Sequence, residues 1–402
     1  MKQNILNKTL LLCPSVGAWQ IDNTLFFDRK FYDGLLIYSK IWPGKLKLLM
    51  SIDKTEPPQF GLIQYDPNNA SFQLDVIASD ERIKAQQLQG VDAVMASADD
   101  FRQAHLSTLC NAMHIKCIYV IEYILETRIQ IAILNQVTLW KKYKSIIWLI
   151  LQEFKLKKAL KLASGIQANG IPAYKKYAPL TSNSLLYFDT RNSESMLITP
   201  DELEARLAYL DKNKPLRLGF SGRLIAIKGA MDLIEIAHIL DKNGVHFSFD
   251  IFGSGDLQRH MQEKITQYHL QGKVLLHGAV DYATVLVPFV KSSLDLFVCC
   301  HKQSDPSCTY LETYACGVPI LGYANRAHTG ILQQVDVGWS VPMNNTVEIA
   351  KLIELLDKNR RAIKLKAKAS LIFAQKHTFE KTFEVRMQQF VDATYHCNHL
   401  SK

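Results

Sequence analysis

A regular alternation of apolar strands and amphipathic helices in residues 216–323 constrains the fold of this chain more than any other feature. Each strand pattern is a short, continuous apolar run, as expected for a strand that is buried on both faces of a sheet. Because helices separate the runs, we expect parallel strands in a doubly wound α/β sheet. The predicted strands are 216–220, 245–252, 273–277, 294–300 and 318–323, and the predicted helices include 227–240, 258–269 and 282–291.

The first half of the chain repeats this pattern less regularly. Its predicted strands are 9–13, 47–52, 72–77, 93–96 and 116–121, with a helix at 31–42. We interpret 9–13 as a strand and not as a signal peptide, because its apolar core is too short and no small-residue cleavage pattern follows. A length of 402 residues favours two domains. Their expected limits are a first domain at 1–190, a linker at 191–214, a second domain at 215–375 and a final helix at 376–402.

Composition excludes several classes of protein. No run reaches the roughly 18 apolar residues that a membrane-spanning helix needs. The eight cysteines form no Cys-x-x-Cys pair and have no Cys/His spacing suited to zinc, so we expect reduced, partly buried thiols. The net charge of +9 is mild, and it becomes informative only where lysines cluster.

The segment 304–320 predicts a loop, a helix, a glycine stop and a buried strand. Backbone N–H groups at the start of such a helix favour phosphate. We therefore expect Ser307, Cys308 and Thr309 to surround a phosphate group. Glu312, one turn into the helix, can accept hydrogen bonds from the vicinal hydroxyls of a sugar. A diphosphate beside a ribose is typical of a bound nucleotide-sugar.

A second constellation follows the predicted strand at 216–220. Gly222 allows close approach of the backbone, and Arg223 and Lys228 follow at the start of the next helix. Two cations at the open end of a parallel sheet can neutralise a diphosphate leaving group. The alternative is that Arg223 and Lys228 are surface residues that cap a helix.

Two glycine turns are weaker signals. The Gly-x-Gly turn that begins at Gly253 follows a predicted strand but lacks the full dinucleotide-binding fingerprint. The loop around Gly17 follows the first predicted strand, and an ordinary turn explains it equally well. We nevertheless expect both glycines to border the donor pocket.

Together these segments resemble the donor site of family 4 glycosyltransferases. The Gly-Arg-Leu…Lys-Gly spacing at 222–229 and the Asp-Pro-Ser-Cys-Thr-x-Leu-Glu signature at 305–312 carry the resemblance, and the signature is similar to that of a bacterial subgroup. The resemblance implies the GT-B fold, in which two Rossmann-like doubly wound domains face each other across a cleft. It also implies that the final helix returns to the first domain.

The implied reaction is transfer of a sugar from a nucleotide-sugar to a glycan or lipid-linked acceptor with retention at the anomeric carbon. The resemblance assigns Arg223 and Lys228 to the donor diphosphate and Glu312 to the ribose. Gly253 lies beside the nucleotide, and the loop at Gly17 borders the reaction centre.

The chain departs from the family pattern at two positions. Family members usually carry a second glutamate eight residues before Glu312, and Ser304 stands there, so that Asp305 is the expected substitute. Glu122 occupies the place of a histidine near the donor sugar in many members. We expect Glu122 to act in catalysis with Arg223 and Lys228, either by binding hydroxyls or by stabilising an oxocarbenium-like transition state. Alternatively, it pairs structurally with Arg128.

The sequence gives no sign of a metal or of any other cofactor. The Asp-x-Asp pair that binds metal and diphosphate in the other main glycosyltransferase fold does not occur. Because Arg223 and Lys228 supply positive charge, we expect the nucleotide-sugar to bind without a divalent ion.

Residues 140–161 combine tryptophans and aliphatic residues with many lysines. Between 141 and 161 there are seven lysines and one acid, Glu153. That composition is typical of an interfacial helix on anionic lipid. We expect this segment to meet an anionic membrane surface, and the alternative is a buried helix with a basic solvated flank. No nucleic-acid-binding fold accompanies it, so we expect no nucleic-acid partner.

The sequence therefore predicts a cytoplasmic enzyme at the inner face of the cytoplasmic membrane, in cell-surface polysaccharide or glycolipid synthesis. The main alternative is a non-catalytic GT-B protein that binds nucleotide-sugar and membrane as a partner or regulator, and Ser304 and Glu122 motivate it. A GT-B epimerase is a third possibility, but it would need carboxylates and histidines in the cleft that the sequence does not indicate.

Overall fold

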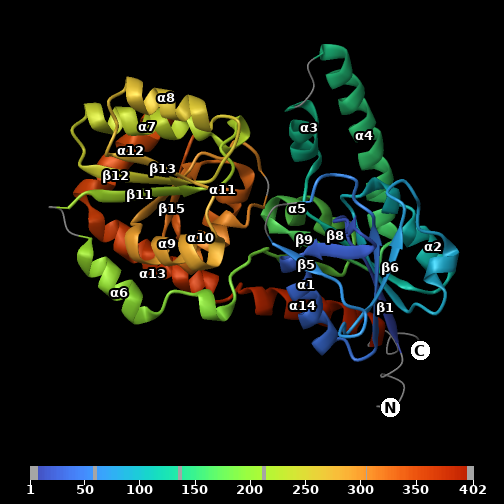
Figure 1. Ribbon diagram of the computed structural model, residues 1–402. Coiled ribbons are helices and arrows are strands. Elements are labelled where there is room, and N and C mark those ends of the chain that lie inside the picture. The colour runs from blue at the N-terminus through green and yellow to red at the C-terminus, as the bar shows by residue number, and fades with distance from the viewer. Residues whose placement is uncertain (1–7, 58–60, 135–137, 211–213, 305, 396–402) are drawn as a thin grey trace. The chain divides into compact units, whose positions relative to one another are not determined.

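The computed structural model describes residues 8–57, 61–134, 138–210, 214–304 and 306–395 (Figure 1). The chain forms two compact units. The first comprises Met1–Tyr187 with Glu380–Lys402, and the second comprises Phe188–Phe379. Each unit is built on one parallel sheet covered by helices, and each is described separately below.

A seven-stranded sheet forms the centre of the first unit, with the order β10-β9-β8-β7-β1-β4-β6. Each neighbouring pair in it is parallel. Its strands are β1 (Thr9–Cys13), β4 (Lys45–Ser51), β6 (Gln73–Ile77), β7 (Ala93–Ser97), β8 (Lys116–Ile121), β9 (Gly165–Asn169) and β10 (Ser184–Tyr187). The chain moves from β1 to β4 and β6 and then crosses to β7, so the strand order reverses between β1 and β7.

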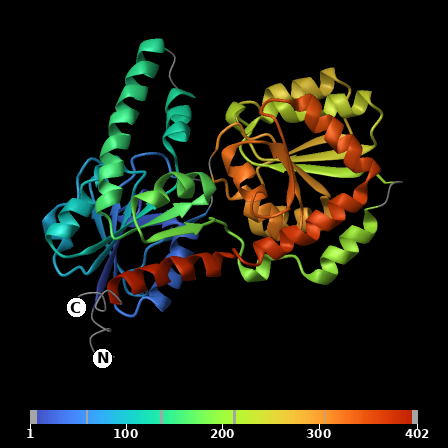
Figure 2. The same cartoon turned by 180° about the vertical axis from the view of Figure 1, so that it is seen from behind.

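The helices of the first unit include one pair that extends beyond the sheet. They are α1 (Arg29–Ile41), α2 (Leu106–Ala112), α3 (Leu125–Leu134), α4 (Leu139–Leu162), α5 (Gly170–Tyr177) and α14 (Phe379–Tyr395). Asp28 caps α1, since its side chain accepts a hydrogen bond from the Phe31 N–H. In Figures 1 and 2, α3 and the upper part of α4 stand clear of the layers around the sheet.

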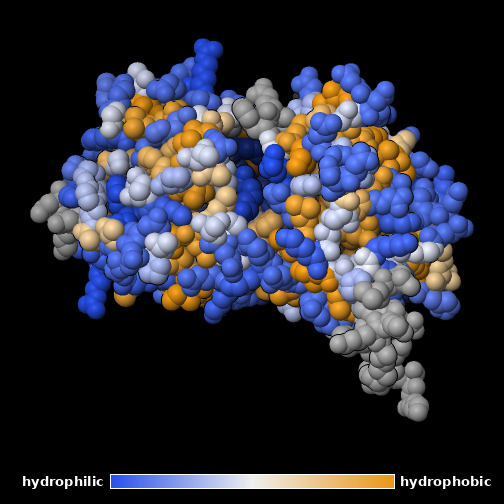
Figure 3. Space-filling view, turned by 60° about the horizontal axis from the view of Figure 1, so that its bottom comes forward, coloured by the Kyte–Doolittle hydropathy of each residue, from blue (hydrophilic) through white to orange (hydrophobic). Residues whose placement is uncertain are grey.

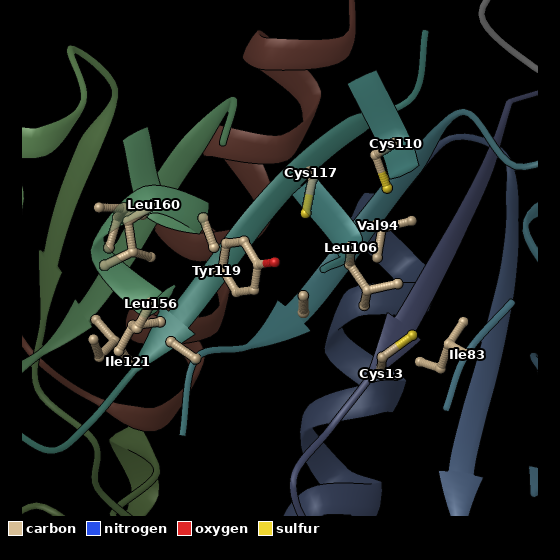
Figure 4. Close-up of a cluster of buried hydrophobic side chains, with 14 of the residues drawn as sticks. Cys13, Ile83, Val94, Leu106, Cys110, Cys117, Tyr119, Ile121, Leu156 and Leu160 are labelled. Carbon is tan, nitrogen blue, oxygen red and sulfur yellow. The ribbon is translucent and has the colours of Figure 1, made fainter. Parts of the chain in front are cut away.

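A buried apolar cluster joins the sheet of the first unit to α2 and the lower part of α4 (Figure 4). Tyr119 on β8 lies inside it, and its hydroxyl donates to the Gln103 carbonyl oxygen at 2.9 Å. Leu156 and Leu160 of α4 are fully buried in the same cluster. This packing fixes the lower half of α4 to the unit. Cys13, Cys110 and Cys117 are free, buried thiols, as the sequence predicts for those positions.

The last helix, α14, belongs to the first unit although the second unit precedes it in sequence. Arg386 Nε donates to Gln167 Oε1 on β9 at 2.9 Å, and Gln167 Nε2 donates to the Arg386 carbonyl oxygen at 2.8 Å. The Phe383 ring lies 4.9 Å from that of Tyr38 on α1. A side chain at Gly34 would clash with Phe383, so this glycine allows α1 and α14 to approach closely.

A small antiparallel sheet flanks the main sheet of the first unit. It consists of β2 (Trp19–Ile21), β3 (Thr24–Asp28) and β5 (Leu62–Gln64), in the order β2-β3-β5. The sequence does not predict it, because its strands are short and only partly buried.

A six-stranded parallel sheet forms the centre of the second unit, with the order β13-β12-β11-β14-β15-β16. Its strands are β11 (Leu216–Ser221), β12 (Phe247–Phe252), β13 (Val274–Gly278), β14 (Leu296–Cys299), β15 (Ile320–Tyr323) and β16 (Gly338–Val341). After β13 the chain crosses back to β14 on the other side of β11. The strand order therefore reverses between β11 and β14, which is where open α/β sheets bind ligands.

Helices cover both faces of the second sheet (Figure 1). They are α6 (Pro200–Tyr209), α7 (Ala230–Lys242), α8 (Gln258–Gln267), α9 (Val287–Ser293), α10 (Thr309–Ala315), α11 (Arg326–Leu332), α12 (Thr346–Lys358) and α13 (Arg360–Ala374).

The segment expected as a linker, 191–214, lies within the second unit. It contains α6, whose Leu203 and Leu207 are buried in a cluster with Leu371 of α13. Arg206 of α6 donates to the carbonyl oxygens of Cys316 and Gly317 at 2.7 and 2.5 Å. The polar composition of the segment concealed this packing, because the buried residues recur only at helical spacing.

On the face seen in Figure 3, hydrophobic groups alternate with hydrophilic ones. Within the described part of the chain, no helix is both long and apolar enough to cross a membrane.

Candidate active site

The candidate site lies at the carboxyl edge of the second sheet, where β11, β12 and β14 end. Gly222 and Arg223 follow β11, Gly253 follows β12, and residues 307–309 follow β14 and begin α10. Because β11 pairs in parallel with both β12 and β14, these segments leave the sheet at the same edge. The predicted donor residues of the second unit therefore converge at the point of strand reversal.

Two glycines allow the turns after β11 and β12 to touch. Gly253 has φ +125°, and a Cβ there would lie 1.9 Å from the Gly222 carbonyl oxygen. The Gly222 N–H donates to the Phe252 carbonyl oxygen at 3.0 Å, and the Gly253 N–H donates to that of Gly278 at 2.7 Å. Only glycine fits at position 253, so the open edge of the sheet is lined by bare backbone at this point.

Lys228 is the buried cation of the site, and Arg223 is exposed. Lys228 is 7% exposed and lies in the short 3₁₀ turn Ala226–Lys228. Gly229 has φ +69°, and a Cβ there would lie 2.2 Å from the Cys300 carbonyl oxygen. The Lys302 N–H also donates to the Ile227 carbonyl oxygen at 2.9 Å. The lysine turn is thus fixed directly against the end of β14.

His301 lies beside this turn and was not predicted as a site residue. Its side chain is 1% exposed, and neither ring nitrogen has a hydrogen-bond partner among the described residues. Burial lowers its pKa well below the usual value, and electrostatic interactions with Lys228 and His328 lower it further. His301 is therefore neutral at physiological pH, and it adds no charge to the cation at Lys228.

Glu312 of α10 is 8% exposed and forms a bidentate ion pair with Arg191. Arg191 Nε donates to Glu312 Oε1 at 2.7 Å, and Arg191 Nη2 donates to Oε2 at 3.2 Å. Burial alone would lower the pKa of Arg191, but the adjacent Glu312 carboxylate outweighs it and raises this pKa. The Arg191 guanidinium also lies 3.9 Å from the ring centroid of Tyr282, whose hydroxyl donates to Asn192 Oδ1.

The loop before α10 is held by its own side chains. Ser307 Oγ donates to Thr309 Oγ1 at 3.1 Å, and Cys308 Sγ donates to Asp189 Oδ2 at 3.3 Å. Since α10 has only seven residues, its dipole is a minor source of anion affinity. The cations at Arg223 and Lys228 are the stronger attraction for a phosphate group.

Ser304 and Asp305 are the two positions that concern the glutamate expected eight residues before Glu312. Ser304 Oγ accepts a hydrogen bond from the Arg326 N–H at 3.1 Å, so this side chain ties its loop to the start of α11. Asp305, the expected substitute, lies outside the described residues.

The first unit carries the other two predicted residues at the carboxyl edge of its own sheet. Gly17 follows β1, and a Cβ there would lie 2.8 Å from Asp53 Cβ and 2.9 Å from the Ser51 carbonyl oxygen. Glu122 follows β8, and its N–H donates to Asp99 Oδ2 at 2.7 Å. Asp99 itself follows β7, so it is an additional carboxylate at this edge that the prediction missed.

Arg128 takes part in a buried hydrogen-bond network that includes Asp99, the acceptor of the Glu122 N–H. Its Nη2 donates to Asp99 Oδ1 at 2.9 Å, and its Nη1 donates to Glu153 Oε2 of α4 at 3.1 Å. The Tyr177 hydroxyl also donates to Glu153 at 3.1 Å. The structural role considered for Arg128 thus involves Asp99 and Glu153, which join α3, α4 and the end of β7.

The prediction from sequence missed a set of residues that surround its own candidates. They are Asp99 in the first unit and Arg191, Asn192, Tyr282 and His301 in the second. Asp99 and His301 had a usable signal, because each lies two positions after a buried strand at the carboxyl edge. No signal in the sequence pointed to Arg191, because it is 121 positions from its partner Glu312. Among the described residues, no three His, Cys, Asp or Glu side chains are placed to hold a metal ion.

Comparisons with known proteins agree with this architecture. Residues 202–371 match the family described as "Glycosyl transferases group 1". No curated protein matches the chain in sequence.

Solved structures resemble the chain over nearly its whole length. Sucrose-phosphate synthase from Thermosynechococcus elongatus aligns with a TM-score of 0.64 and 14% identity, over 98% of this chain and 100% of that one. Anabaena Alr3699/HepE in complex with UDP aligns with a TM-score of 0.63 and 12% identity, over 96% and 100% of the two chains. The apo form of the lipopolysaccharide outer core galactosyltransferase WaaB gives 0.62 and 10%, over 97% and 99%.

At these identities the structures establish the fold. The two parallel α/β sheets form two Rossmann-like domains, and the predicted GT-B fold is confirmed. The match over 202–371 runs from within α6 to within α13, and it includes Arg223, Lys228 and Glu312. Residues 202–371 of the second unit are thus similar to group 1 glycosyl transferases in a chain of GT-B fold, and the predicted enzyme class, glycosyltransferase, is confirmed.

Proposed function

We propose that this protein is a retaining, metal-independent glycosyltransferase that moves a sugar from a nucleotide-sugar to a glycan or lipid-linked acceptor. The observation that carries the proposal is the fixed turn at Lys228 beside the end of β14. It places a buried ammonium at the strand reversal of the second sheet, where a ligand diphosphate would be neutralised. Glu312 supplies a carboxylate near the same edge for the hydroxyls of a ribose.

In the proposed mechanism Arg223 and Lys228 stabilise the negative charge that develops on the departing diphosphate. Both are held on the segment that follows β11, and the preorganised position of Lys228 means that little rearrangement is needed during reaction. In a retaining transfer the departing phosphate takes the proton of the acceptor hydroxyl. A protein base is then unnecessary, and we expect Glu122 to hold hydroxyls instead. Gly253 keeps the turn after β12 close to Gly222, and Gly17 keeps the turn after β1 close to Ser51 and Asp53, so both shape the edges that we expect to border the donor.

UDP is the first nucleotide to test, because Anabaena HepE was solved with UDP and with UDP-glucose. WaaB, a galactosyltransferase of the lipopolysaccharide outer core, supports an acceptor in cell-surface polysaccharide or glycolipid synthesis. We place the reaction at the cytoplasmic side of the inner membrane. The bacterial subgroup with the signature at 305–312 and the role of Asp305 are part of the same proposal.

The alternative is a non-catalytic protein that retains nucleotide-sugar binding. Ser304 favours it, because its hydroxyl is engaged with the Arg326 N–H and a serine lacks the carboxylate that a glutamate would offer to a sugar. Lys228 and Glu312 favour the enzyme.

A donor-hydrolysis assay distinguishes the two functions. Purified protein is incubated with a panel of nucleotide-sugars, and release of the nucleoside diphosphate is measured for the wild type and for Lys228→Met. We expect slow release from one donor, lowered about a hundredfold or more in the variant, since removing one charge-stabilising donor has this effect in other enzymes. A circular dichroism melt verifies that the variant folds. If the wild type binds a nucleotide but releases none from any donor, the non-catalytic function is correct.

A further inference from the structure

Helix α4 exposes a stripe of large apolar side chains on the half that extends beyond the sheet. The stripe consists of Trp140, Tyr143, Ile147, Leu151 and Phe154. At about 3.6 residues per turn, these five positions fall within about 80° of the helix circumference. Trp140 is 69% exposed and Phe154 is 68% exposed. A contiguous exposed stripe of this kind marks an interaction surface, whereas scattered single residues do not.

The opposite side of α4 packs against its own unit. Leu149, Leu156 and Leu160 are buried there, and Leu156 and Leu160 lie in the core of the unit. Glu153 is buried on the same side, where it accepts hydrogen bonds from Arg128 and Tyr177. The stripe therefore faces away from the unit, whereas Glu153, the one acid of α4, faces into it.

The charges that border the stripe are all positive. Lys144, Lys155 and Lys158 are exposed on the solvent-facing side of the helix. The Lys144 ammonium lies 5.2 Å from the ring centroid of Trp140. Because Glu153 is turned inward, the one lysine of α4 that it pairs with is Lys157, at 3.9 Å, and it does not offset Lys144, Lys155 or Lys158. The surface thus combines an aromatic apolar strip with a border of cations.

The combination of an apolar strip and bordering lysines favours one kind of binding partner over another. A second copy of the chain would bring its own lysines against these, and α4 offers no outward acid to pair with them. An anionic lipid surface satisfies both features, since the acyl boundary accepts the apolar side chains and the headgroups accept the ammonium groups. Tryptophan and tyrosine are also the residues that favour the membrane interface.

We propose that the outward face of α4 docks this protein on an anionic lipid bilayer, with Trp140, Tyr143, Ile147, Leu151 and Phe154 entering the headgroup–acyl boundary. The buried links from Arg128 to Glu153 and Asp99 fix the helix to β7 and α3, so that the stripe reaches the membrane on a rigid support. This inference rests on the surface of α4 alone and stands whether or not the proposed reaction is correct.

Vesicle flotation tests the proposal on the full chain. Neutral phosphatidylcholine vesicles are compared with vesicles that also contain phosphatidylglycerol. We expect the protein to float with the anionic vesicles and to stay in the soluble fraction with neutral ones. Equal recovery in the soluble fraction with both kinds of vesicle would overturn the proposal.

Two variants separate the two parts of the surface. In the first, the five stripe residues become serine, and we expect a more than tenfold loss of affinity for anionic vesicles with all lysines intact. In the second, Lys144, Lys155 and Lys158 become glutamine. We expect a loss of about fivefold per lysine and of about a hundredfold in total, because each lysine near such a surface contributes about that much.

Matched controls come from exposed positions of the second unit. Lys242→Gln, Lys351→Gln and Lys376→Gln together remove the same charge, and Leu355→Ser, Leu365→Ser and Ile372→Ser together remove exposed apolar groups. Neither triple variant should change flotation. If the two lysine sets weakened binding equally, net charge alone would explain it and the proposed surface would be wrong. Thermal melts verify that each variant is folded.

Trp140 reports insertion directly. We expect its fluorescence to shift to shorter wavelength with anionic vesicles, and Trp140→Phe should reduce that shift while keeping flotation. Sedimentation without lipid tests the rival occupant. A wild-type dimer that the serine stripe variant abolishes, with no flotation of the wild type, would assign the surface to a second copy and overturn the proposal. The assay uses no donor, so its failure and a failure of nucleotide-sugar turnover are separate results.

Discussion

Arg128 in the first unit and Arg191 in the second both bind carboxylates, but their surroundings differ. Arg128 is 7% exposed and lies between Asp99 and Glu153. Arg191 pairs with Glu312 alone among the salt bridges described, and its side chain is 45% exposed. The first arginine is enclosed by its partners, whereas the second covers one carboxylate and keeps a side open to water.

This difference separates a structural ion pair from a functional one. Breaking an enclosed pair leaves a charge that water cannot reach, so its cost appears in stability. Arg191 can exchange Glu312 for water, because its side chain is 45% exposed, whereas Glu312 is 9% exposed. In the proposed function a ligand hydroxyl takes the place of Arg191 at Glu312. We therefore expect substitutions at Arg128 to change folding and substitutions at Glu312 to change binding.

The largest effect is expected for Arg128→Met. Asp99 would lose the Arg128 cation, and Glu153 would keep only the more distant Lys157 and Lys176, at 3.9 and 4.0 Å, so we expect the first unit to lose about 3–5 kcal/mol of stability. Denaturant unfolding measures this loss, and nucleotide affinity should not change. Arg102→Met is the matched control, because Arg102 pairs with Asp100 at a more exposed position and should cost no more than about 1 kcal/mol. An equal loss in both variants would remove the distinction between the two kinds of pair.

The second largest effect is expected from acid pH, which should lower the folding stability of the second unit. Burial lowers the pKa of His328 to about 4, and burial together with Lys376 lowers that of His377 to about 4. Because both folded values lie below the unfolded value of about 6.5, the unfolded chain binds more protons between these limits, and stability falls as pH falls through this window. At about pH 5.5 we expect a loss of about 3 kcal/mol for the two groups together.

Fluorescence unfolding at neutral and mildly acid pH measures that loss. Trp339 is the tryptophan of the second unit, and the other four lie in the first unit, so Trp339→Phe identifies the transition concerned. His377→Gln should remove about a third of the pH dependence, because the pKa values of His301 and His328 are lowered in the same direction. Stability of the second unit that does not change over this window would contradict the assignment of neutral, buried histidines.

A smaller effect, on binding, is expected for Glu312→Gln. Loss of charged hydrogen bonds to a ribose should lower nucleotide affinity about 10- to 100-fold, which corresponds to about 1.4–2.7 kcal/mol. Stability should fall much less than in Arg128→Met, because Arg191 is half exposed. Titration calorimetry with UDP and a denaturant curve measure the two quantities. Glu263→Gln, on the exposed pair with Arg259, controls for the lost charge. Unchanged affinity with a large loss of stability would make Glu312 structural, like Arg128's partners.

The smallest effect is expected at Tyr282, which supports Arg191. Tyr282→Phe removes the hydrogen bond to Asn192 but keeps the ring under the guanidinium, and we expect a loss of about 0.5–1.5 kcal/mol. Tyr282→Leu should cost about 0.5–1 kcal/mol more, because the cation–π contact is also lost. Thermal unfolding of the two variants measures the difference. Identical stabilities would show that the ring does not hold Arg191.

Sequence patterns predicted five of the six strands of the second unit, because β11, β12, β14 and β15 are short apolar runs that are mostly buried. β13 was also predicted although it is partly exposed, and β16 was missed. The first unit was harder. β9 reads Gly-Ile-Gln-Ala-Asn, yet all five residues are buried, and Gln167 is satisfied by Arg386, which is 219 positions away. Such long-range pairing leaves no local signal. The three strands of the antiparallel sheet were missed for a related reason, since short half-exposed strands show no period.

In the candidate site, too, some residues could be predicted from local sequence and others depend on long-range contacts. Lys228 and Gly253 were identified from local turns at strand ends, where parallel topology determines their place. The partner of Glu312 could not be predicted, because only folding brings residue 191 to residue 312. The burial of His301 was equally hidden, although its position after β14 was visible in the sequence.

The most direct test of the central claim, that the carboxyl edge of the second sheet binds the nucleotide of a sugar donor, is a thermal-shift screen. The wild type and Glu312→Ala are heated with UDP, GDP, ADP and CDP in turn. We predict that one nucleotide raises the melting temperature of the wild type and that the rise disappears in the variant. A wild type that responds to none of the four, or a variant that responds as strongly as the wild type, would contradict the claim.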